Sequence, residues 1–396
     1  MKNTEVQLVE ADGLSRMKWE YEIDKNKYPD LLGMGTADMD FKSPQPLLDE
    51  LAEVIRTGHL GYPWVDDRYY EVISQWLKRT CGWEIEGRFC IANGLGIYHS
   101  AGFLIDLLSR PGDRVTILSP VHMCFKQLIN VHERFCLECP LVLDGDHYRI
   151  NYQMLESCFA SGSRLLWLCN PHNPVGRVWK REELEKIAKL CLKYNVSIMS
   201  DDVYCGLLYE GYRYTPIASL SPEISRRTVT MYSTSKSYNT SGLRHSYIVT
   251  ENAELLKRYR EAIDRYNMNY GMNIMGIHAT MAAYSFCDGW LKELMHKVAE
   301  NHAFLADFCA EKLALVHLLP AEATYFAWID MRKLGIPPKQ LAYLIAQEEH
   351  LIVENGSNEG KGGDGFIRIN LATSRENVEE AAERLLDFYQ HHTMAC

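Results

Sequence analysis

Lys236 draws attention first, because it follows an apolar run and lies among hydroxyl residues in YSTSKSYNTSGLR (232–244). A lysine that directly follows a buried strand can have a lowered pKa, and its neutral amine can then attack a carbonyl carbon as a nucleophile. Most single lysines are simply solvated. The segment therefore predicts amine chemistry only if other parts of the sequence supply the groups that such chemistry needs.

Three further polar clusters supply such groups. Asp201 in SDDVY (200–204) has apolar neighbours, so its carboxylate needs a partner such as a cationic ring nitrogen, although helix N-capping is an equally ordinary role. Two Asn-Pro steps fix the backbone around Asn173 in NPHNPVG (170–176), which is also typical of a plain turn. Glycines in ANGLGIYHS (92–100) open a helix whose bare N–H groups can bind an anion.

Taken together, these four clusters indicate one kind of site. An amine nucleophile, a carboxylate for a ring nitrogen, an amide donor and an anion-binding helix start are the parts that a pyridoxal 5′-phosphate site requires. No third glycine completes a G-x-G-x-x-G motif, so a dinucleotide fingerprint is not supported. The sequence thus predicts an enzyme that uses pyridoxal 5′-phosphate.

The elements that must position these groups form an alternating pattern between about residues 90 and 250. Amphipathic stretches such as 181–194 separate short runs that are apolar at both parities, as in strands buried on both faces. This succession predicts an α/β fold with a mostly parallel sheet, and ligands bind such sheets at the carboxyl edge of the strands. The candidate strands are 114–119, 164–169, 196–200, 228–233 and 246–250.

The pattern changes after about residue 285. A long helical stretch (287–315), strand candidates at 324–330 and 366–371, and helices at 337–349 and 375–391 predict a smaller α+β domain. We expect an N-terminal segment (1–45) that packs with this small domain, a large cofactor-binding domain (46–285) and the small domain itself (286–396). The glycine-rich run NGSNEGKGGDG (355–365) precedes a strand rather than a helix, so it predicts a surface loop rather than a phosphate cradle.

Charge and composition exclude several classes. A net charge of −10 argues against nucleic-acid partners and anionic membranes. The polar, acidic start lacks the apolar core of a signal peptide, and no run of about 18 apolar residues could span a membrane. Twelve cysteines without such a signal indicate reduced thiols and a cytoplasmic location.

Several other cysteines, histidines and tyrosines have ordinary structural interpretations. Cys136 and Cys139 form a single C-x-x-C without a second pair, which does not predict a zinc site. The pair His391-His392 near the end predicts an exposed tail rather than a metal site. Four tyrosines are expected to pack in cores or at a subunit interface: Tyr69, Tyr70, Tyr266 and Tyr270.

From about residue 30 to 390, the order of these motifs resembles the fold-type I pyridoxal phosphate enzymes of the class I/II aminotransferase superfamily. The resemblance implies a seven-stranded sheet, a homodimer with shared active sites, and Lys236 holding the cofactor as a Schiff base. Asp201 would pair with the pyridinium nitrogen, and Asn173 and Tyr204 would hydrogen-bond the ring hydroxyl.

The same resemblance implies the remaining site residues. His122 would stack on the cofactor ring, Arg368 in GFIRINLA would bind the substrate α-carboxylate, and Thr36 would lie in the wall over the substrate. The phosphate would be held by Ser233, Arg244, the amides of Leu95 and Gly96, and Tyr62 from the neighbouring subunit.

Within the superfamily, four segments resemble the carbon–sulfur β-lyases of the cystathionine β-lyase type, related to the maltose-regulon modulator: ADMDF (37–41), NPHNPVGRVW (170–179), KSYNTSGLRHS (236–246) and ATYFAWID (323–330). This resemblance predicts α,β-elimination of a cysteine-derived thioether to a thiol, pyruvate and ammonia. Tyr204 and Arg244 match the transaminases instead, so an aminotransferase that acts on an L-amino acid and a 2-oxo acid stays open.

Two readings from other classes carry less support. Ser233 to Lys236 satisfies the S-x-x-K motif of penicillin-recognising serine hydrolases, but the chain has no K-T-G tripeptide. A non-catalytic regulator that keeps the fold is the other alternative, since fold alone does not fix function. A complete set of Lys236, Asp201 and Arg368 favours catalysis.

Overall fold

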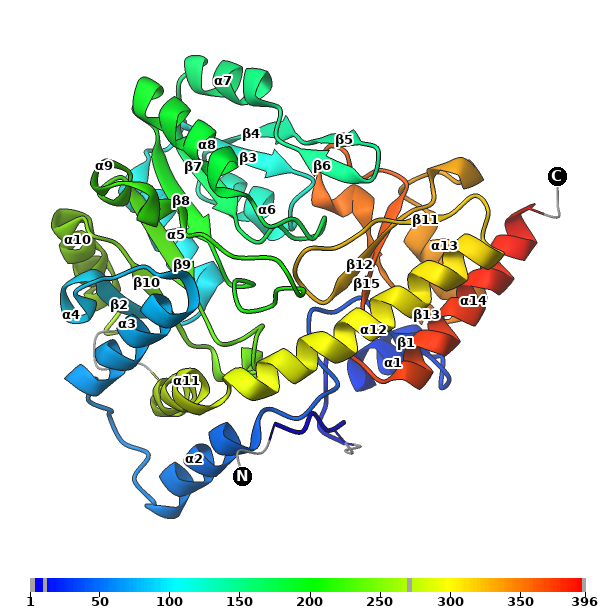
Figure 1. Ribbon diagram of the computed structural model, residues 1–396, viewed down its shortest axis with the longest axis horizontal. Coiled ribbons are helices and arrows are strands. Elements are labelled where there is room, and N and C mark those ends of the chain that lie inside the picture. The colour runs from blue at the N-terminus through cyan, green and yellow to red at the C-terminus, as the bar shows by residue number, and fades with distance from the viewer. Residues whose placement is uncertain (1–3, 10–12, 269–272, 394–396) are drawn as a thin grey trace.

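A seven-stranded sheet forms the larger part of the computed structural model, which describes residues 4–9, 13–268 and 273–393 (Figure 1). All its strands run parallel to one another except β10, which is antiparallel to both of its neighbours. The predicted α/β class with a mostly parallel sheet is confirmed. Across the sheet the strands are β2 (Ile91–Gly94), β10 (Ser246–Val249), β9 (Thr228–Tyr232), β8 (Ser197–Asp201), β7 (Ser163–Cys169), β3 (Arg114–Ser119) and β4 (Phe135–Pro140).

Helices cover both faces of this sheet. Residues at both odd and even positions of the central strands are therefore buried, which explains why both sets are apolar. Leu166 and Leu168 pack with α7 and α8 on one face, whereas Leu165 and Trp167 pack with α5, α6 and α10 on the other. The five predicted strands are all present, with ends that differ by at most one residue. The covering helices are α5 (Ile97–Leu108), α6 (Cys124–Val131), α7 (Tyr152–Ala160), α8 (Arg181–Tyr194) and α10 (Ala253–Asp264).

A second, four-stranded sheet lies toward the C-terminal end of the chain, where α12 runs along it in Figure 1. All its pairings are antiparallel. It comprises β11 (His317–Leu318), β12 (Phe326–Asp330), β15 (Phe366–Asn370) and β14 (Glu354–Asn355). The helices of this region are α12 (Asp288–Lys312), α13 (Leu341–Glu349) and α14 (Arg375–Thr393).

The N-terminal part of the chain joins this second region. Strand β1 (Leu32–Gly33) pairs in parallel with β13 (Leu351–Ile352), and Lys18 forms a buried ion pair of 2.7 Å with Asp40. The domain boundaries at residues 45 and 285 stay a prediction. The remaining elements are α1 (Glu20–Asn26), α2 (Gln45–Arg56), α3 (Asp67–Cys81), α4 (Gly87–Cys90), β5 (Val142–Asp144), β6 (His147–Arg149), α9 (Pro222–Ser225), α11 (Ile274–Phe286) and the 3₁₀ turns η1 (Ile217–Leu220), η2 (Ser241–Leu243), η3 (Arg332–Leu334) and η4 (Gly356–Glu359).

The glycine-rich run 355–365 is only in part the surface loop that its composition predicts, since Asn358, Lys361, Gly362 and Asp364 are exposed. Asn355, Gly356 and Glu359 are buried, and the amide of Val121 donates a hydrogen bond of 2.8 Å to the carbonyl of Glu359. The loop packs against a segment more than 200 residues earlier in the chain, which local composition does not reveal.

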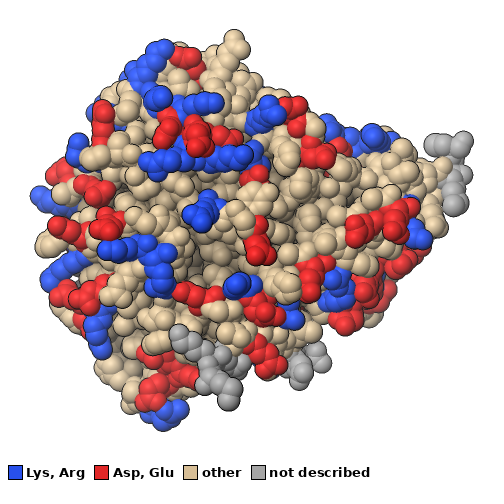
Figure 2. All heavy atoms as spheres, viewed as in Figure 1, with Lys and Arg blue, Asp and Glu red and all other residues tan. Residues whose placement is uncertain are grey.

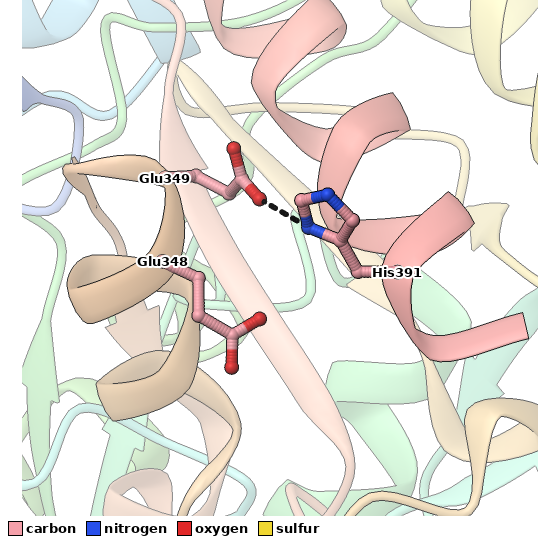
Figure 3. A group of neighbouring side chains, drawn as sticks. All are labelled: Glu348, Glu349 and His391. Atoms are coloured by element: carbon pink, nitrogen blue, oxygen red, sulfur yellow. Dashed lines mark hydrogen bonds and ion pairs between the residues drawn. The ribbon is translucent and has the colours of Figure 1, made fainter. Parts of the chain in front are cut away.

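His391 is exposed as predicted, but both His391 and His392 belong to α14 rather than to a tail. Figure 3 shows the imidazole of His391 hydrogen-bonded to Glu349, with Glu348 beside it on α13. His392 bonds Glu348 in turn. These contacts join α14 to α13, and they account for the close approach of Glu348, Glu349 and His391 without an ion.

The predicted tyrosines lie in different environments. Tyr69 is buried, with its hydroxyl 2.8 Å from Nε2 of His245, while Tyr70 is half-buried and Tyr266 is exposed. Tyr270 lies outside the described residues.

The described surface and thiols show two further features. Acidic and basic side chains are interspersed on the face seen in Figure 2. All eleven cysteines in the described part of the chain are free thiols. Among the described helices, none combines the length and the apolar character needed to cross a bilayer.

Candidate active site

A cavity of about 480 Å³ lies where β7, β8 and β9 end and α5 begins. Its size is in the range typical of small-molecule sites. Because the carboxyl ends of parallel strands meet at one edge of the sheet, groups far apart in sequence converge here. Eight predicted site residues line it: Gly96, His122, Asn173, Asp201, Tyr204, Ser233, Lys236 and Arg244.

Lys236 lies in the turn after β9, and its Nζ donates a hydrogen bond of 2.8 Å to the carbonyl of Ala37. Burial lowers the pKa of Lys236 to about 8, although the nearby carboxyl of Asp38 opposes this change. The amine is therefore more easily deprotonated than a solvated lysine, as a nucleophile or a general base requires.

Asp201 is the last residue of β8 and is only 7% exposed. Its Oδ1 accepts a hydrogen bond of 3.3 Å from the amide of Val203, in a turn rather than at the start of a helix, so the N-cap alternative is wrong. Burial raises the pKa of Asp201 to about 7, against the lowering effects of that amide and of Lys236. A cation beside it would stabilise the ionised carboxylate.

Arg368, on β15, does not line the cavity but is bound to a residue that does. Its Nη1 donates a hydrogen bond of 3.0 Å to Oδ1 of Asn173, and its Nη2 one of 3.2 Å to the carbonyl of Gly35. The guanidinium also lies 4.1 Å from the centroid of the Phe326 ring. Thr36 contributes through its backbone, since its carbonyl accepts from Asn370 at 2.7 Å.

At the other end of the cavity, Gly96 precedes α5 with φ 117°, a backbone conformation that favours glycine. Its amide donates a hydrogen bond of 3.0 Å to Oγ of Ser246, so it already has an internal partner. The Oγ of Ser233 donates to the carbonyl of His245 at 2.7 Å. Arg244 is exposed and lines the cavity, whereas Leu95, next to Gly96, does not.

Tyr62 is another predicted site residue that lies outside the cavity lining. It lies between α2 and α3, is 83% exposed, and is not among the residues that line the cavity of its own chain. Its role depends on the proposed second subunit.

His122 lines the cavity, and burial together with the positive charges of Arg368 and Lys236 lowers its pKa to about 3. Its imidazole is therefore neutral at pH 7, an uncharged aromatic ring.

The sequence did not single out Tyr98, Cys124 or Trp167, which also line the cavity. Trp167 stacks on Phe125 with ring centroids 3.9 Å apart. The signal that could have found Trp167 is its position two residues before Cys169, the last residue of β7, because alternate residues of a strand share one face.

An open, mostly parallel sheet with an amine, a buried carboxylate and a helix start at its carboxyl edge defines an α/β enzyme of the cofactor-binding kind. The chain matches the family described as "Aminotransferase class I and II" over residues 81–385, and it belongs to that family.

Relatives and solved structures refine this placement. The chain is 30% identical to cystathionine beta-lyase PatB of Bacillus subtilis (strain 168) over 94% of its own length and 96% of that protein. It is similar to the structure of cystalysin from Treponema denticola, which contains pyridoxal 5′-phosphate (TM-score 0.92, 29% identity, 96% and 97% coverage). A pyridoxal phosphate-bound putative aminotransferase from Clostridium difficile 630 is also similar (TM-score 0.93, 31% identity, 97% and 98% coverage).

Proposed function

We propose that the protein is a pyridoxal 5′-phosphate-dependent carbon–sulfur β-lyase that converts a cysteine-derived thioether to a thiol, pyruvate and ammonia. The observation that carries this proposal is the shared cavity of Lys236 and Asp201, an amine of lowered pKa and a buried carboxylate. Similarity to PatB and to cystalysin favours β-elimination among the reactions that this family performs.

The donor set fits the cofactor. The carboxylate of Asp201 is buried and accepts a hydrogen bond from the backbone amide of Val203. A protonated ring nitrogen would supply the positive charge that balances this carboxylate. Asn173 and Tyr204 would bind the ring hydroxyl, and the neutral ring of His122 would stack on the cofactor. Ser233, Arg244 and the start of α5 would hold the phosphate. When bound, the cofactor supplies an electron sink for negative charge that develops at the substrate Cα.

The chain's own residues then have separable tasks. Arg368 would bind the substrate α-carboxylate through paired N–H donors and so orient the Cα–H bond. Lys236 would take the Cα proton on Nζ, a transfer for which a pKa of about 8 is well placed. Loss of that proton allows a thiolate on Cβ to leave with the bonding electron pair.

An aminotransferase is the second candidate, since Tyr204 and Arg244 resemble the transaminase pattern and one similar structure is named a putative aminotransferase. The same residues serve both reactions, and the outcome depends on the leaving group and on where Lys236 returns its proton.

The deciding experiment measures pyruvate and ammonia formed from cystathionine, cysteine and S-alkyl cysteines, with and without a 2-oxo acid acceptor. A lyase releases both products without the acceptor. Turnover that requires the acceptor and yields no pyruvate from thioethers would contradict the lyase assignment and favour transamination.

Replacement of Arg368 by alanine should raise KM for the amino-acid substrate by roughly 10²-fold, because a charge-assisted, paired contact to the carboxylate is lost. Cofactor content should persist, since the proposed role concerns the substrate alone. Arg332→Ala is the matched control: this arginine pairs with Asp330 near the same sheet but is exposed. Loss of cofactor from Arg368→Ala, with KM unchanged, would show that its role is misassigned.

We also propose that the enzyme is a homodimer in which Tyr62 reaches the phosphate of the neighbouring subunit. Tyr62 and two apolar residues close to it in sequence are exposed, which supports an interface at this place: Leu60 and Trp64. Trp64→Arg should shift the protein toward monomer and lower its activity, as measured by sedimentation velocity alongside turnover. Tyr343→Arg changes an exposed aromatic on α13 and should alter neither. A fully active wild-type monomer would refute the shared site.

A further inference from the structure

Glu359 is a buried carboxylate that the proposed mechanism does not use. It is the last residue of η4, in the loop that leads to β15, and is 1% exposed. Neither carboxylate oxygen has a side-chain hydrogen-bond partner among the described residues. A buried charge in that state is costly unless an ion of opposite sign lies near it.

The cation near Glu359 is Arg368. Its Nη1 lies 3.6 Å from Oε1 of Glu359, an ion pair in which both side chains are almost fully buried. The hydrogen-bond acceptors of the guanidinium, on Asn173 and Gly35, are neutral oxygens. The charge of Arg368 is therefore balanced by Glu359 before any substrate arrives.

A substrate α-carboxylate would bring a second negative charge to the same guanidinium. Two carboxylates that share one cation in a buried setting repel each other, and such pairs relieve the repulsion when one of them binds a proton. Glu359 is suited to do so, because burial and the nearby carboxylate of Glu354 raise its pKa to about 7, although Arg368 opposes the rise.

The other groups around Glu359 supply no second positive charge. The backbone amide of Met123, on the segment packed against the loop, lowers the pKa of Glu359 through a hydrogen bond but carries no net charge. Burial raises the pKa of the Cys124 and Cys169 thiols and of the Tyr204 phenol, so these groups are neutral at pH 7.

We propose that Glu359 is the resident counterion of Arg368 and takes up a proton when a substrate carboxylate binds that arginine. The inference rests on the proposed role of Arg368. Glu359 acts here as a positioning residue, because it works through Arg368. Below the pKa of Glu359 its neutral carboxyl leaves Arg368 free for the ligand. Above that pKa binding requires a proton, so affinity falls as pH rises, by up to about tenfold per pH unit.

The test uses the holoenzyme and 3-(methylthio)propanoate, a substrate-like carboxylate with no amino group that could condense with the cofactor. Calorimetric titrations in two buffers of different ionisation enthalpy, at pH 6, 7 and 8, measure the protons taken up on binding. We expect wild-type uptake to approach one proton at pH 8 and to be small at pH 6.

The isosteric variant Glu359→Gln should lose this uptake and bind the probe about tenfold more tightly than wild type at pH 8, with similar affinity at pH 6. In turnover of a thioether, its change should appear in KM rather than kcat. Glu354→Gln is the control: it keeps the uptake but moves it to lower pH, because a neighbouring negative charge that raises the pKa of Glu359 is gone.

Wild-type binding without proton uptake, or the same uptake in Glu359→Gln, overturns the inference. Failure of the wild type to bind the probe overturns it as well, together with the role given to Arg368. If Glu359→Gln loses its fold, Glu359→Met provides the same comparison. If the enzyme releases pyruvate but binding takes up no proton, the lyase function holds and the role of Glu359 is refuted. If proton uptake depends on Glu359 but no pyruvate is released, the role of Glu359 holds and the lyase function is refuted.

Discussion

Replacing Lys236 with alanine should abolish turnover and remove the visible absorbance of lysine-bound cofactor. Its amine is the nucleophile that would bind the cofactor covalently and the base that would take the Cα proton, so one change removes both functions. Positioned proton transfer alone contributes roughly 10²–10⁴-fold, and we therefore expect a loss of at least about 10⁴-fold in kcat/KM. Absorbance spectra of the purified variant and an assay for pyruvate measure the two effects.

Lys361→Ala is the matched control, because this lysine is exposed in the loop before β15. It should keep both colour and activity. A Lys236→Ala protein that retains the wild-type spectrum and turnover would end the cofactor assignment, and the S-x-x-K alternative would then need to be tested.

Asp201→Asn should lower kcat by roughly 10²–10³-fold while the protein stays folded. The amide has the shape of the carboxylate but no charge, so it cannot stabilise a protonated ring nitrogen, and loss of one well-placed electrostatic group is typically of this size. Steady-state kinetics at saturating substrate and cofactor isolates the effect on kcat from weaker cofactor binding.

The neighbouring residue provides a sharp comparison. Asp202 is also a buried carboxylate, but it bonds the hydroxyls of Ser200 and Tyr214 and does not line the cavity. Asp202→Asn should therefore lower the thermal midpoint with little change in kcat. The assignment of Asp201 fails if Asp201→Asn keeps wild-type kcat, or if the two variants exchange these effects.

Local sequence was sufficient for the fold class and for the amine, the carboxylate and the helix start of the cavity, whereas the roles of His122, Tyr204, Ser233 and Arg244 came from the family resemblance. The central strands carry apolar residues at both parities, and their ends bring Asp201 and Lys236 to one edge of the sheet. Strands β2 and β4 were not predicted. β2 has only four residues and contains glycine, while β4 lies at the edge of the sheet with half-exposed side chains, so neither presents the fully apolar pattern of a central strand.

Features that depend on distant packing were not predictable in this way. Polar, glycine-rich composition is typical of exposed loops, yet Glu359 is buried because residues near Val121 cover it. The predicted roles of Leu95 and Tyr62 likewise involve partners that local pattern does not specify, and the structure leaves those roles as predictions.

The carbonyl of Ala37 accepts hydrogen bonds from Lys236 and from the Tyr325 hydroxyl, and Asn370 donates to the carbonyls of Thr36 and Asp38. The contacts of Asn370 join parts of the chain that leave the ribosome more than 300 residues apart. At translation speeds of about 5–20 residues per second, the early segment waits roughly 15–70 s for its last partners. A nascent chain that has not yet exposed β15 therefore lacks Arg368 and Asn370, and the contacts that these residues make with the segment around Thr36 cannot form until they emerge.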